Sequence, residues 1–408
     1  MNLTRRIFLK DSALAMVGVG MVPAWLGRSA WASEITGKNK VLVAIFQRGA
    51  VDGLNVVIPH GERVYYDLRP SIAVPEASVL KLDPIFGLHP ALAAFKPLWD
   101  NGQLAAVQAA GSPDPSRSHF DAQDYMESGT PGNKSTGTGW LNRALGLDPH
   151  AGRSPMRAVA MGAELPLTLQ GHVPAVAIHN LNQFRRGGGP LAAGFAAMYD
   201  HASDSLLAPA GRDTFQALRM VKQLDPKRYR IAAGAHYPNQ PLGASLRQLA
   251  QLIKADVGVQ VAFADVGGWD NHVNEGGAEG QMAGHLLGFA EAISAFWTDL
   301  GPRQQDVVVV TMSEFGRTVR ENGNRGTDHG HANVMFVLGG GVRGGKVYGG
   351  WPGLAPEQLY QDRDLAVTTD FRAVLGEAVL RHLGVSDLAA VFPGYIAAPA
   401  QFCNFLPS

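Results

Sequence analysis

The chain has one cysteine and no excess of charge of either sign. Cys403 is the only cysteine among 408 residues, so no intramolecular disulfide, thiolate cluster or Cys-x-x-Cys redox pair can form. Lysine plus arginine and aspartate plus glutamate both number 35, so no basic field favours a nucleic-acid partner. Any metal ion must therefore be bound by oxygen and imidazole ligands, which suit Zn, Mn, Mg or Ca.

The composition is that of a folded protein with many loops. Hydrophobic residues make up 46% of the chain, which is enough for a large core in one big α/β domain or two smaller ones. The 49 glycines and 25 prolines exceed average usage, and they predict numerous tight turns rather than low complexity.

The first 32 residues have the pattern of a targeting segment. Paired arginines in TRRIFLK precede a moderately apolar run at 13–26 and an Ala30-Trp31-Ala32 cleavage site. The segment resembles the signals of the bacterial twin-arginine export system, which carries folded proteins. We therefore expect cleavage of 1–32, recognition by that export machinery, and a mature protein in the periplasm or outside the cell. The apolar run is too short and glycine-rich to span a bilayer, and no cysteine follows it, so we expect no permanent membrane anchor.

Apolar runs alternate with helical patterns along the rest of the chain. Buried strands are predicted at 41–46 and 103–111, and a helix is predicted to begin near Ser118. The same alternation returns after residue 255. It predicts an α/β fold with a mostly parallel sheet and helices on its faces. We expect one domain over 33–408, with a helical insertion at about 180–255.

Polar residues follow several of the predicted strands. They are Asp52, Ser118 with His119, Asp270 with His272, and Glu314. Open parallel sheets build their sites at this carboxyl edge, because loops from several strands converge there. Asp328, His329 and His331 instead precede a strand, so their loop must fold back over the same edge to join the others. The predicted metal ligands are Asp52, Asp270, His272, Glu314, Asp328, His329 and His331, which would hold one or two divalent cations.

Each of these residues also has a purely structural interpretation. Asp52 could shape a turn, Glu314 could pair with Arg317 or Arg320, and Ser118 could cap a helix. The sequence leaves these alternatives open. The metal hypothesis is favoured by the number of acids and histidines on separate loops.

The motifs IFQRGAVDGLN, SRSHFDAQDYMESG, GGWDNHVNE, TMSEFGRT, GTDHGHAN and LGGGVRGG resemble, in this order, the exported bacterial family known as domain of unknown function 1501. That family is distantly similar to the alkaline phosphatase and sulfatase superfamily. The resemblance implies a three-layer α/β/α sandwich with a helical insertion, a metal site at the carboxyl edge, and hydrolysis of phosphate or sulfate esters.

The resemblance carries over to only some residues. Asp52 resembles the superfamily's first metal-binding aspartate, and Asp270 with His272 resembles a later Asp and His pair, although the usual spacing is wider. Glu314 stands where the superfamily usually has Asp-His. Either His329 or His331 resembles its late metal-binding histidine.

The nucleophile is where the chain departs most from the superfamily. Pro113 stands where sulfatases carry the cysteine or serine that becomes an aldehyde hydrate, so a sulfatase of that type is disfavoured. Ser118 is the predicted nucleophile, because a helix N-terminus lowers the cost of an alkoxide. His119 is predicted as a metal ligand or general acid. Arg48, Arg117 and Arg317 are predicted to bind the anion.

Two functions follow from these predictions. One is an exported metal-dependent hydrolase whose substrate is an anionic ester, either a small molecule or a glycan. The other is a metal-stabilised binding or assembly protein of the periplasm or cell surface that lacks catalysis. The metal, the substrate and the oligomeric state stay open at this stage.

Overall fold

The computed structural model describes residues 40–148, 154–186, 216–217, 219–222, 229–396 and 398–408. The expected signal segment and residues 187–215 of the expected insertion lie outside this part of the chain. Residues 40–408 form one compact unit.

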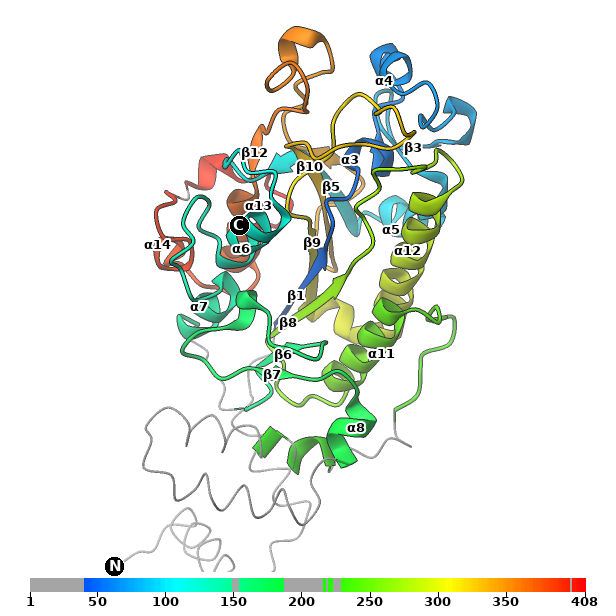
Figure 1. The fold of residues 1–408 in the computed structure, drawn as a ribbon. Coiled ribbons are helices and arrows are strands. Elements are labelled where there is room, and N and C mark those ends of the chain that lie inside the picture. Colours follow the sequence, from blue (N-terminus) through cyan, green and yellow to red (C-terminus); the bar gives the residue numbers. More distant parts are fainter. Residues whose placement is uncertain (1–39, 149–153, 187–215, 218, 223–228, 397) are drawn as a thin grey trace, which may run out of the picture. The chain divides into compact units, whose positions relative to one another are not determined.

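A central sheet of nine strands organises the described residues (Figure 1). Its order is β11-β5-β10-β9-β1-β8-β6-β7, and β12 also pairs with β5. The strands are β1 (Val41–Gln47), β5 (Leu104–Gly111), β6 (Ala158–Ala160), β7 (Val176–Ala177), β8 (Val261–Val266), β9 (Val307–Met312), β10 (Asn333–Gly339), β11 (Val347–Tyr348) and β12 (Thr369–Asp370). All the pairings in this sheet are parallel except those of β10 with β5 and β9, which confirms the mostly parallel sheet predicted from the sequence.

Helices cover both faces of the sheet and make three layers. Val43 and Ile45 of β1 face α11 (Pro241–Lys254) and α12 (Gln281–Leu300). Leu42 and Ala44 face the opposite layer, which contains α7 (Trp140–Gly146) and α13 (Phe371–Arg381). Successive side chains of a strand point to opposite faces, so the continuous apolar run at 41–46 is what a strand covered on both sides requires. The α/β/α arrangement is visible in Figure 1.

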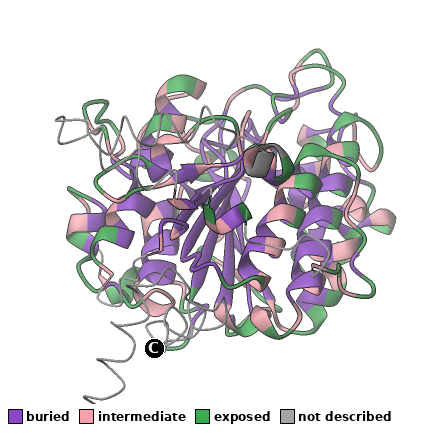
Figure 2. Cartoon of the chain, turned by 90° about the horizontal axis from the view of Figure 1, so that it is seen from below, coloured by how far each residue is buried: buried purple, intermediate pink, exposed green. Residues whose placement is uncertain are grey.

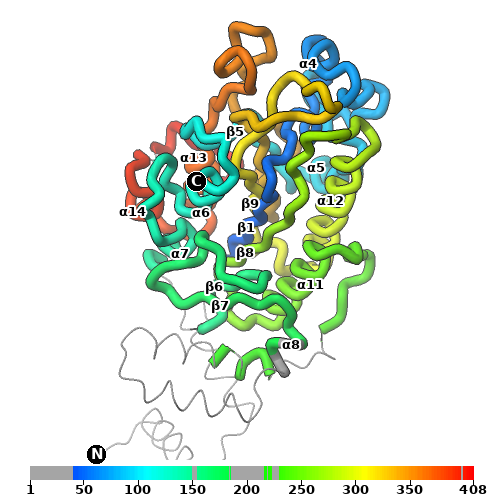
Figure 3. Tube along the Cα trace, in the orientation of Figure 1, coloured from blue at the N-terminus to red at the C-terminus, as the bar shows by residue number. Residues whose placement is uncertain are grey.

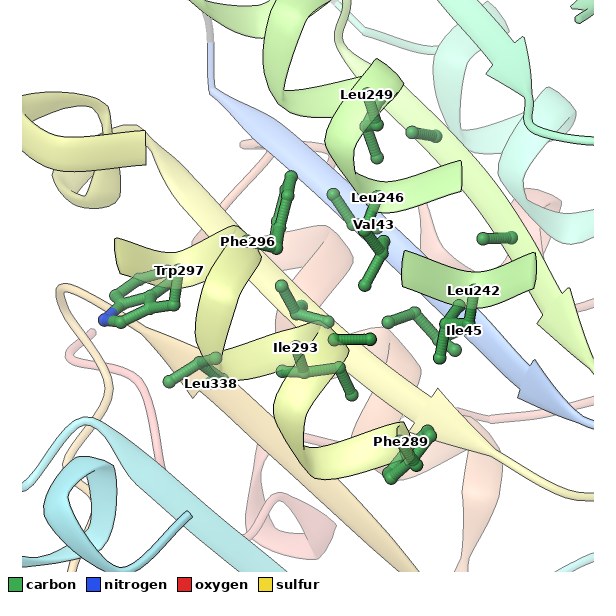
Figure 4. Packing of buried hydrophobic residues seen from close by; sticks show 14 of the residues in the cluster. Val43, Ile45, Leu242, Leu246, Leu249, Phe289, Ile293, Phe296, Trp297 and Leu338 are labelled. Atoms are coloured by element: carbon green, nitrogen blue, oxygen red, sulfur yellow. The ribbon is translucent and has the colours of Figure 1, made fainter. Parts of the chain in front are cut away.

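The larger core lies between β1 and the helix pair α11 and α12 (Figure 4). Leu242, Leu246 and Leu249 lie at helical spacing on α11, and Phe289 and Phe296 come from α12. Burying each such side chain stabilises the fold by about 1.5–3 kcal/mol. Figure 2 shows the result as a buried sheet flanked by helices whose outer faces are exposed. Although α11 lies within the range of the expected insertion, it belongs to the layer that covers the sheet.

Shorter elements complete the described structure. They are α3 (Gly53–Val56), α4 (Arg63–Leu68), α5 (Lys96–Asp100), α6 (His119–Ser128), α8 (Leu181–Arg186), α14 (Leu388–Val391), and a small sheet of β2 (Val57–Ile58), β3 (Leu80–Lys81) and β4 (Gly87–Leu88), together with six short 3₁₀ helices at 76–78, 90–95, 167–169, 301–306, 356–358 and 399–401. No helix among the described residues combines the length and apolar character that crossing a bilayer requires.

Strand β10 runs against its neighbours, and this reversal positions the candidate site. Asn333, at its start, pairs with Ala110 near the end of β5, whereas Gly339, at its end, pairs with Val308 near the start of β9. The residues before β10 therefore lie at the carboxyl edge of the parallel strands. The loop that carries His329 reaches this edge because the strand is antiparallel.

Candidate metal centre

Four segments that are distant in sequence meet at the carboxyl edge of the sheet. Helix α6 supplies His119, the loop after β8 supplies Asp270 and His272, and the loop before β10 supplies His329. Strands β1, β8 and β9 are parallel neighbours, so their carboxyl ends lie at one edge of the sheet, and Figure 3 shows the three strands side by side. Ligand-capable residues separated by 210 positions are thus in direct contact.

Three imidazole nitrogens and one carboxylate oxygen lie close together. The Nε2 atom of His329 lies 3.0 Å from Nε2 of His119 and 3.0 Å from Nε2 of His272. The Oδ1 atom of Asp270 lies 3.3 Å from His329 Nε2, 3.5 Å from His119 Nε2 and 3.0 Å from His272 Nε2. The four atoms form two triangles that share the edge between His329 and Asp270.

The other nitrogen of each imidazole contacts a hydrogen-bond acceptor on the outer side. His119 Nδ1 donates to Glu314 Oε1 at 2.8 Å, and His272 Nδ1 donates to Asp328 Oδ1 at 3.0 Å. His329 Nδ1 donates to the backbone carbonyl of Arg117 at 2.9 Å. These acceptors place the proton on Nδ1 in all three rings, so a neutral imidazole directs its Nε2 lone pair inward. Outer partners of this kind orient the histidine ligands of metal sites.

The inward lone pairs lie closer together than one shared hydrogen atom can satisfy. A carbonyl can only accept, so His329 keeps its proton on Nδ1 and offers a single lone pair at Nε2. That lone pair can accept one hydrogen bond, yet two imidazole nitrogens approach it at 3.0 Å. An extra proton on His119 or on His272 would satisfy one of these two contacts and leave the other without a hydrogen bond. A divalent cation bound here would accept the lone pairs of His119 and His329 together with an Asp270 oxygen.

The separations also suit a metal ion. His119, Asp270 and His329 each offer a ligand atom, and these atoms lie within 4.8 Å of one another. Zinc bonds of 2.0–2.1 Å in a tetrahedron separate ligand atoms by about 3.3 Å, and the contacts described above are 3.0–3.5 Å. These three residues form a group that could hold a metal ion, and His272 Nε2 lies beside two of them, at 3.0 Å from His329 Nε2 and 3.0 Å from Asp270 Oδ1.

We call His119, Asp270, His272 and His329 the cluster. Glu314 contacts His119 on the side of the ring that faces away from the cluster. It is buried, and its Oε1 atom accepts from His119, from Gln123 Nε2 at 2.9 Å and from the amide of Gly49 at 2.8 Å. Burial alone would raise the pKa of the Glu314 carboxyl, but these hydrogen bonds lower it below its usual value. The predicted ligand Glu314 is thus placed as an orienting partner of His119. Asp328 has the same relation to His272, and Asn322 also donates to it at 3.1 Å.

Gly49 allows its own loop to approach the loop that carries Asp270. Its φ of +116° is a conformation that favours glycine, and an added Cβ would lie 2.8 Å from the amide nitrogen of Asp270. Any larger residue would push the Asp270 loop outward. The Gly49 amide is therefore available to Glu314 while Asp270 stays beside His329.

Arg317 holds Asp270 in place through a hydrogen-bonded ion pair. Its buried guanidinium donates to Asp270 Oδ1 at 2.6 Å and to the backbone carbonyls of Ala50 at 2.6 Å and Trp269 at 3.1 Å. Burial opposes ionisation of Asp270, but the Arg317 guanidinium outweighs it and lowers the pKa of the carboxyl. Because its donors are used within the protein, Arg317 is placed as a loop-positioning residue and not as the predicted anion-binding group.

The other predicted anion-binding arginines are also engaged. Arg48 donates to Asp265 at 2.6 Å, to Gln123 at 2.8 Å and to Glu127 at 2.7 Å. Arg117 donates to the buried carboxylate of Asp364 at 3.0 Å and to Gln361 at 2.8 Å. Both guanidinium groups are thus engaged with carboxylates of the protein, and their role in binding an anion stays a prediction.

Two of the predicted metal ligands lie outside the cluster. Asp52 is buried and binds the guanidinium of Arg69 through both carboxylate oxygens, so a cationic side chain takes the place expected for a metal. His331 is buried with its ring stacked on Tyr360, the ring centroids being 4.3 Å apart. The structure thus places both residues outside the group of His119, Asp270 and His329 that could hold a metal ion.

Ser118 occupies the N-cap position of α6, directly before His119. Its carbonyl accepts from the amide of Ala122 at 2.9 Å, but its side chain makes no capping hydrogen bond. In the structure, the Ser118 side chain therefore does not cap helix α6.

Sequence reasoning missed Gln123, Arg69 and Glu275. Gln123 lies one helical turn after His119, and this spacing could have indicated that both contact Glu314. Glu275 is buried beside Asp52 and accepts from Thr327 at 2.8 Å. Burial and the Asp52 charge both raise the pKa of the Glu275 carboxyl, and no local pattern indicates this pairing.

Residues 99–392 match the family model described as protein of unknown function, DUF1501. The chain belongs to this family. The DUF1501 match covers most of the sheet together with His119, Asp270, His272, Glu314 and His329. No curated protein sequence matches the chain.

Several solved structures resemble this DUF1501 protein at low sequence identity. The PsFucS1 sulfatase from Pseudoalteromonas sp. is 12% identical, with a TM-score of 0.40, over 94% of this chain and 78% of the sulfatase. The PH0037 protein from Pyrococcus horikoshii is 13% identical, with a TM-score of 0.31, over 76% of this chain and 88% of its own. The C-terminal periplasmic domain of EcEptC from Escherichia coli, in complex with Zn, is 10% identical, with a TM-score of 0.30, over 74% and 73%.

Proposed function

We propose that this protein is a metal-dependent hydrolase of phosphate or sulfate esters. The observation that carries the proposal is the convergence of His119, His329 and Asp270 on one point, with an acceptor behind each imidazole. Catalytic zinc sites commonly use three protein ligands and keep a further position for water or substrate. A divalent cation bound here would supply Lewis acidity that neutralises charge developing on the ester oxygens.

The chain's own residues would divide the remaining tasks. His119, His329 and Asp270 would hold the cation, and Glu314 would keep the His119 proton on Nδ1. Ser118 stays the candidate nucleophile, since its side chain makes no capping hydrogen bond and it adjoins His119. Arg317 would keep Asp270 ionised and oriented.

A second function is favoured by His272. If His272 joins the other three residues, four protein donors close a tetrahedral site, which is the pattern of structural zinc. The protein would then be a metal-stabilised binding or assembly protein without catalysis.

Activity assays with metal-loaded protein separate the two functions. The full chain would be tested against aryl phosphates, phosphodiesters and aryl sulfates after loading with Zn or Mn. We expect hydrolysis by the wild type and by His331→Ala, and its loss in Asp270→Ala and His329→Ala. Retention of one ion per chain without cleavage of any ester would reject the hydrolase. Loss of that ion in His272→Ala would then support the closed structural site.

The location proposed for this activity is outside the cytoplasm. The paired arginines and the cleavage site supply the support for this part of the proposal. We expect fractionation of cells that express the full chain to recover it outside the cytoplasm. Replacing Arg5 and Arg6 with lysines should retain it inside, and an unchanged distribution would exclude this export route.

A further inference from the structure

A cavity of about 580 Å³ lies against the outer side of the metal cluster. Three segments enclose it, namely α4, residues 318–328 and residues 354–363. In Figures 1 and 3 these are the blue α4, a gold loop and the orange loop at the top of the view. The cavity is of the size that binds small organic molecules.

The cavity shares part of its wall with the cluster. Asp328 lines the cavity and accepts from Nδ1 of His272. Arg363 also lines it, and one of its nitrogens donates to the backbone carbonyl of His329 at 2.8 Å. A molecule in the cavity would therefore be separated from the His272 imidazole by the Asp328 carboxylate, and it would contact the Arg363 side chain that bonds the His329 backbone.

The charged side chains that line the cavity differ in how many hydrogen bonds and ion pairs they already make within the protein. Both carboxylate oxygens of Glu321 accept hydrogen bonds from Ser71, and one also accepts from the amide of Ile72. The carboxylate of Asp328 is held by His272 and Asn322. Arg320 is exposed and has no ion-pair partner among the described residues, and Arg363 reaches the nearest oxygen of Asp364 only at 3.6 Å. Asp362 is the remaining acid. The Arg320 fork is thus the cationic group most available to a ligand, with Arg363 beside it partly engaged by the His329 carbonyl, and arginine forks bind phosphate or sulfate oxygens well.

The opposite part of the lining is apolar. It consists of Val64, Leu68, Leu354, Pro356 and Leu359. Leu359 and Val64 are half-buried, so part of each side chain is open to a ligand. A small inorganic anion would leave this surface unused, whereas an aryl or alkyl group would cover it and gain about 25 cal/mol for each Å² removed from water.

We propose that the cavity binds the organic part of an amphiphilic monoester, with an aryl or alkyl group against the apolar wall and its anionic group beside Arg320 and Arg363. This assignment of the substrate class rests on the proposed hydrolase function. It selects phosphate or sulfate esters of apolar alcohols and phenols over those of polar sugars.

Binding of non-hydrolysable anions tests the cavity without depending on turnover. Phenylphosphonate and methylphosphonate would be titrated calorimetrically into the Zn-loaded full chain. Burial of the phenyl ring predicts that phenylphosphonate binds about tenfold more tightly or better. Leu359→Ser and Val64→Asn should each reduce this preference, while Leu287→Ser, at an exposed leucine of α12, should keep it. Arg320→Gln should weaken both ligands, while Arg343→Gln should weaken neither.

The outcomes separate the cavity from the chemistry. Equal binding of the two phosphonates, or a preference unchanged in both Leu359→Ser and Val64→Asn, would overturn the cavity assignment even if esters are hydrolysed. If the preference and its loss are observed but no ester is cleaved, the hydrolase proposal falls and the class of bound ligand stands.

Discussion

The Nδ1 atom of His119 and the Oε1 atom of Glu314 lie 2.8 Å apart, although 195 residues separate them in the sequence. Glu314 is buried at the end of β9, and His119 begins α6 after β5. The contact fixes the imidazole with Nε2 directed at Asp270 and His329. Glu314 is thus the residue that orients this helix-terminal histidine as a candidate metal donor.

Replacing this carboxylate should weaken metal binding without abolishing it. Glu314→Gln keeps the side-chain volume but removes the charge that holds the His119 proton on Nδ1. We expect the affinity for Zn to fall about 10–100-fold, as for other outer-shell partners of metal-bound histidines. Competition with a chromophoric chelator would measure it. An unchanged affinity would show that the ring is oriented by its other contacts.

Two histidines at alternate positions should differ in their effect on metal content. His329 joins the cluster, whereas His331 stacks on Tyr360. We expect His329→Ala to lose the ion and His331→Ala to keep it, as measured by elemental analysis of dialysed protein. The second variant is a matched control, because it removes the same side chain from the same loop. Equal metal content in the two variants would contradict the cluster.

The buried guanidinium of Arg317 should contribute strongly to stability. Arg317→Met would leave the carbonyls of Gly49, Ala50 and Trp269 without their donor and Asp270 without its cation. Breaking a buried pair of this kind costs about 3–5 kcal/mol. Urea unfolding of metal-free protein would measure the loss. Arg320→Met, at an exposed neighbouring position, should change stability by less than about 0.5 kcal/mol. Similar losses in the two variants would contradict the role given to Arg317.

Because His382 is buried, we expect the protein to lose stability in mild acid. Burial lowers the pKa of its imidazole to about 4, and Nε2 donates to the carbonyl of Val41 at 3.0 Å. Between this value and the ordinary pKa of about 6.5, the unfolded chain binds more protons than the folded chain, so acid favours unfolding. From about pH 7 to about pH 5 we expect His382 to account for a loss of about 2 kcal/mol.

Urea unfolding at about pH 7 and about pH 5 would measure how much stability the protonation of His382 removes. His382→Gln keeps a hydrogen-bond donor but cannot titrate, so its stability should fall less over the same range. If both proteins lose the same stability, His382 is not the titrating group.

The sequence predicted the strands and most of the cluster because both have local signals. The runs 41–46 and 103–111 are apolar throughout, and β1 and β5 lie within one residue of their predicted ends. Asp270, His272 and His329 follow or precede such runs, so their common edge could be inferred. The inward direction of each ring could not, because it depends on Glu314, Asp328 and a backbone carbonyl that only folding brings near.

Other features had no local signal at all. An apolar run such as 334–338 does not tell whether its strand is parallel or antiparallel, so the reversal of β10 was not foreseen. From the sequence, Asp52 was predicted to be a metal ligand. In the structure its carboxylate binds Arg69, which follows helix α4. Positions 329 and 331 are equivalent in an extended segment, and only Tyr360 and Asp270 distinguish them.

Arg317 also ties together two turns at this edge of the sheet. Its guanidinium bonds the turn that carries Gly49 and the turn that carries Trp269 and Asp270. One buried side chain thus couples the positions of the two turns, so a displacement of the Gly49 turn would also displace the Asp270 carboxylate.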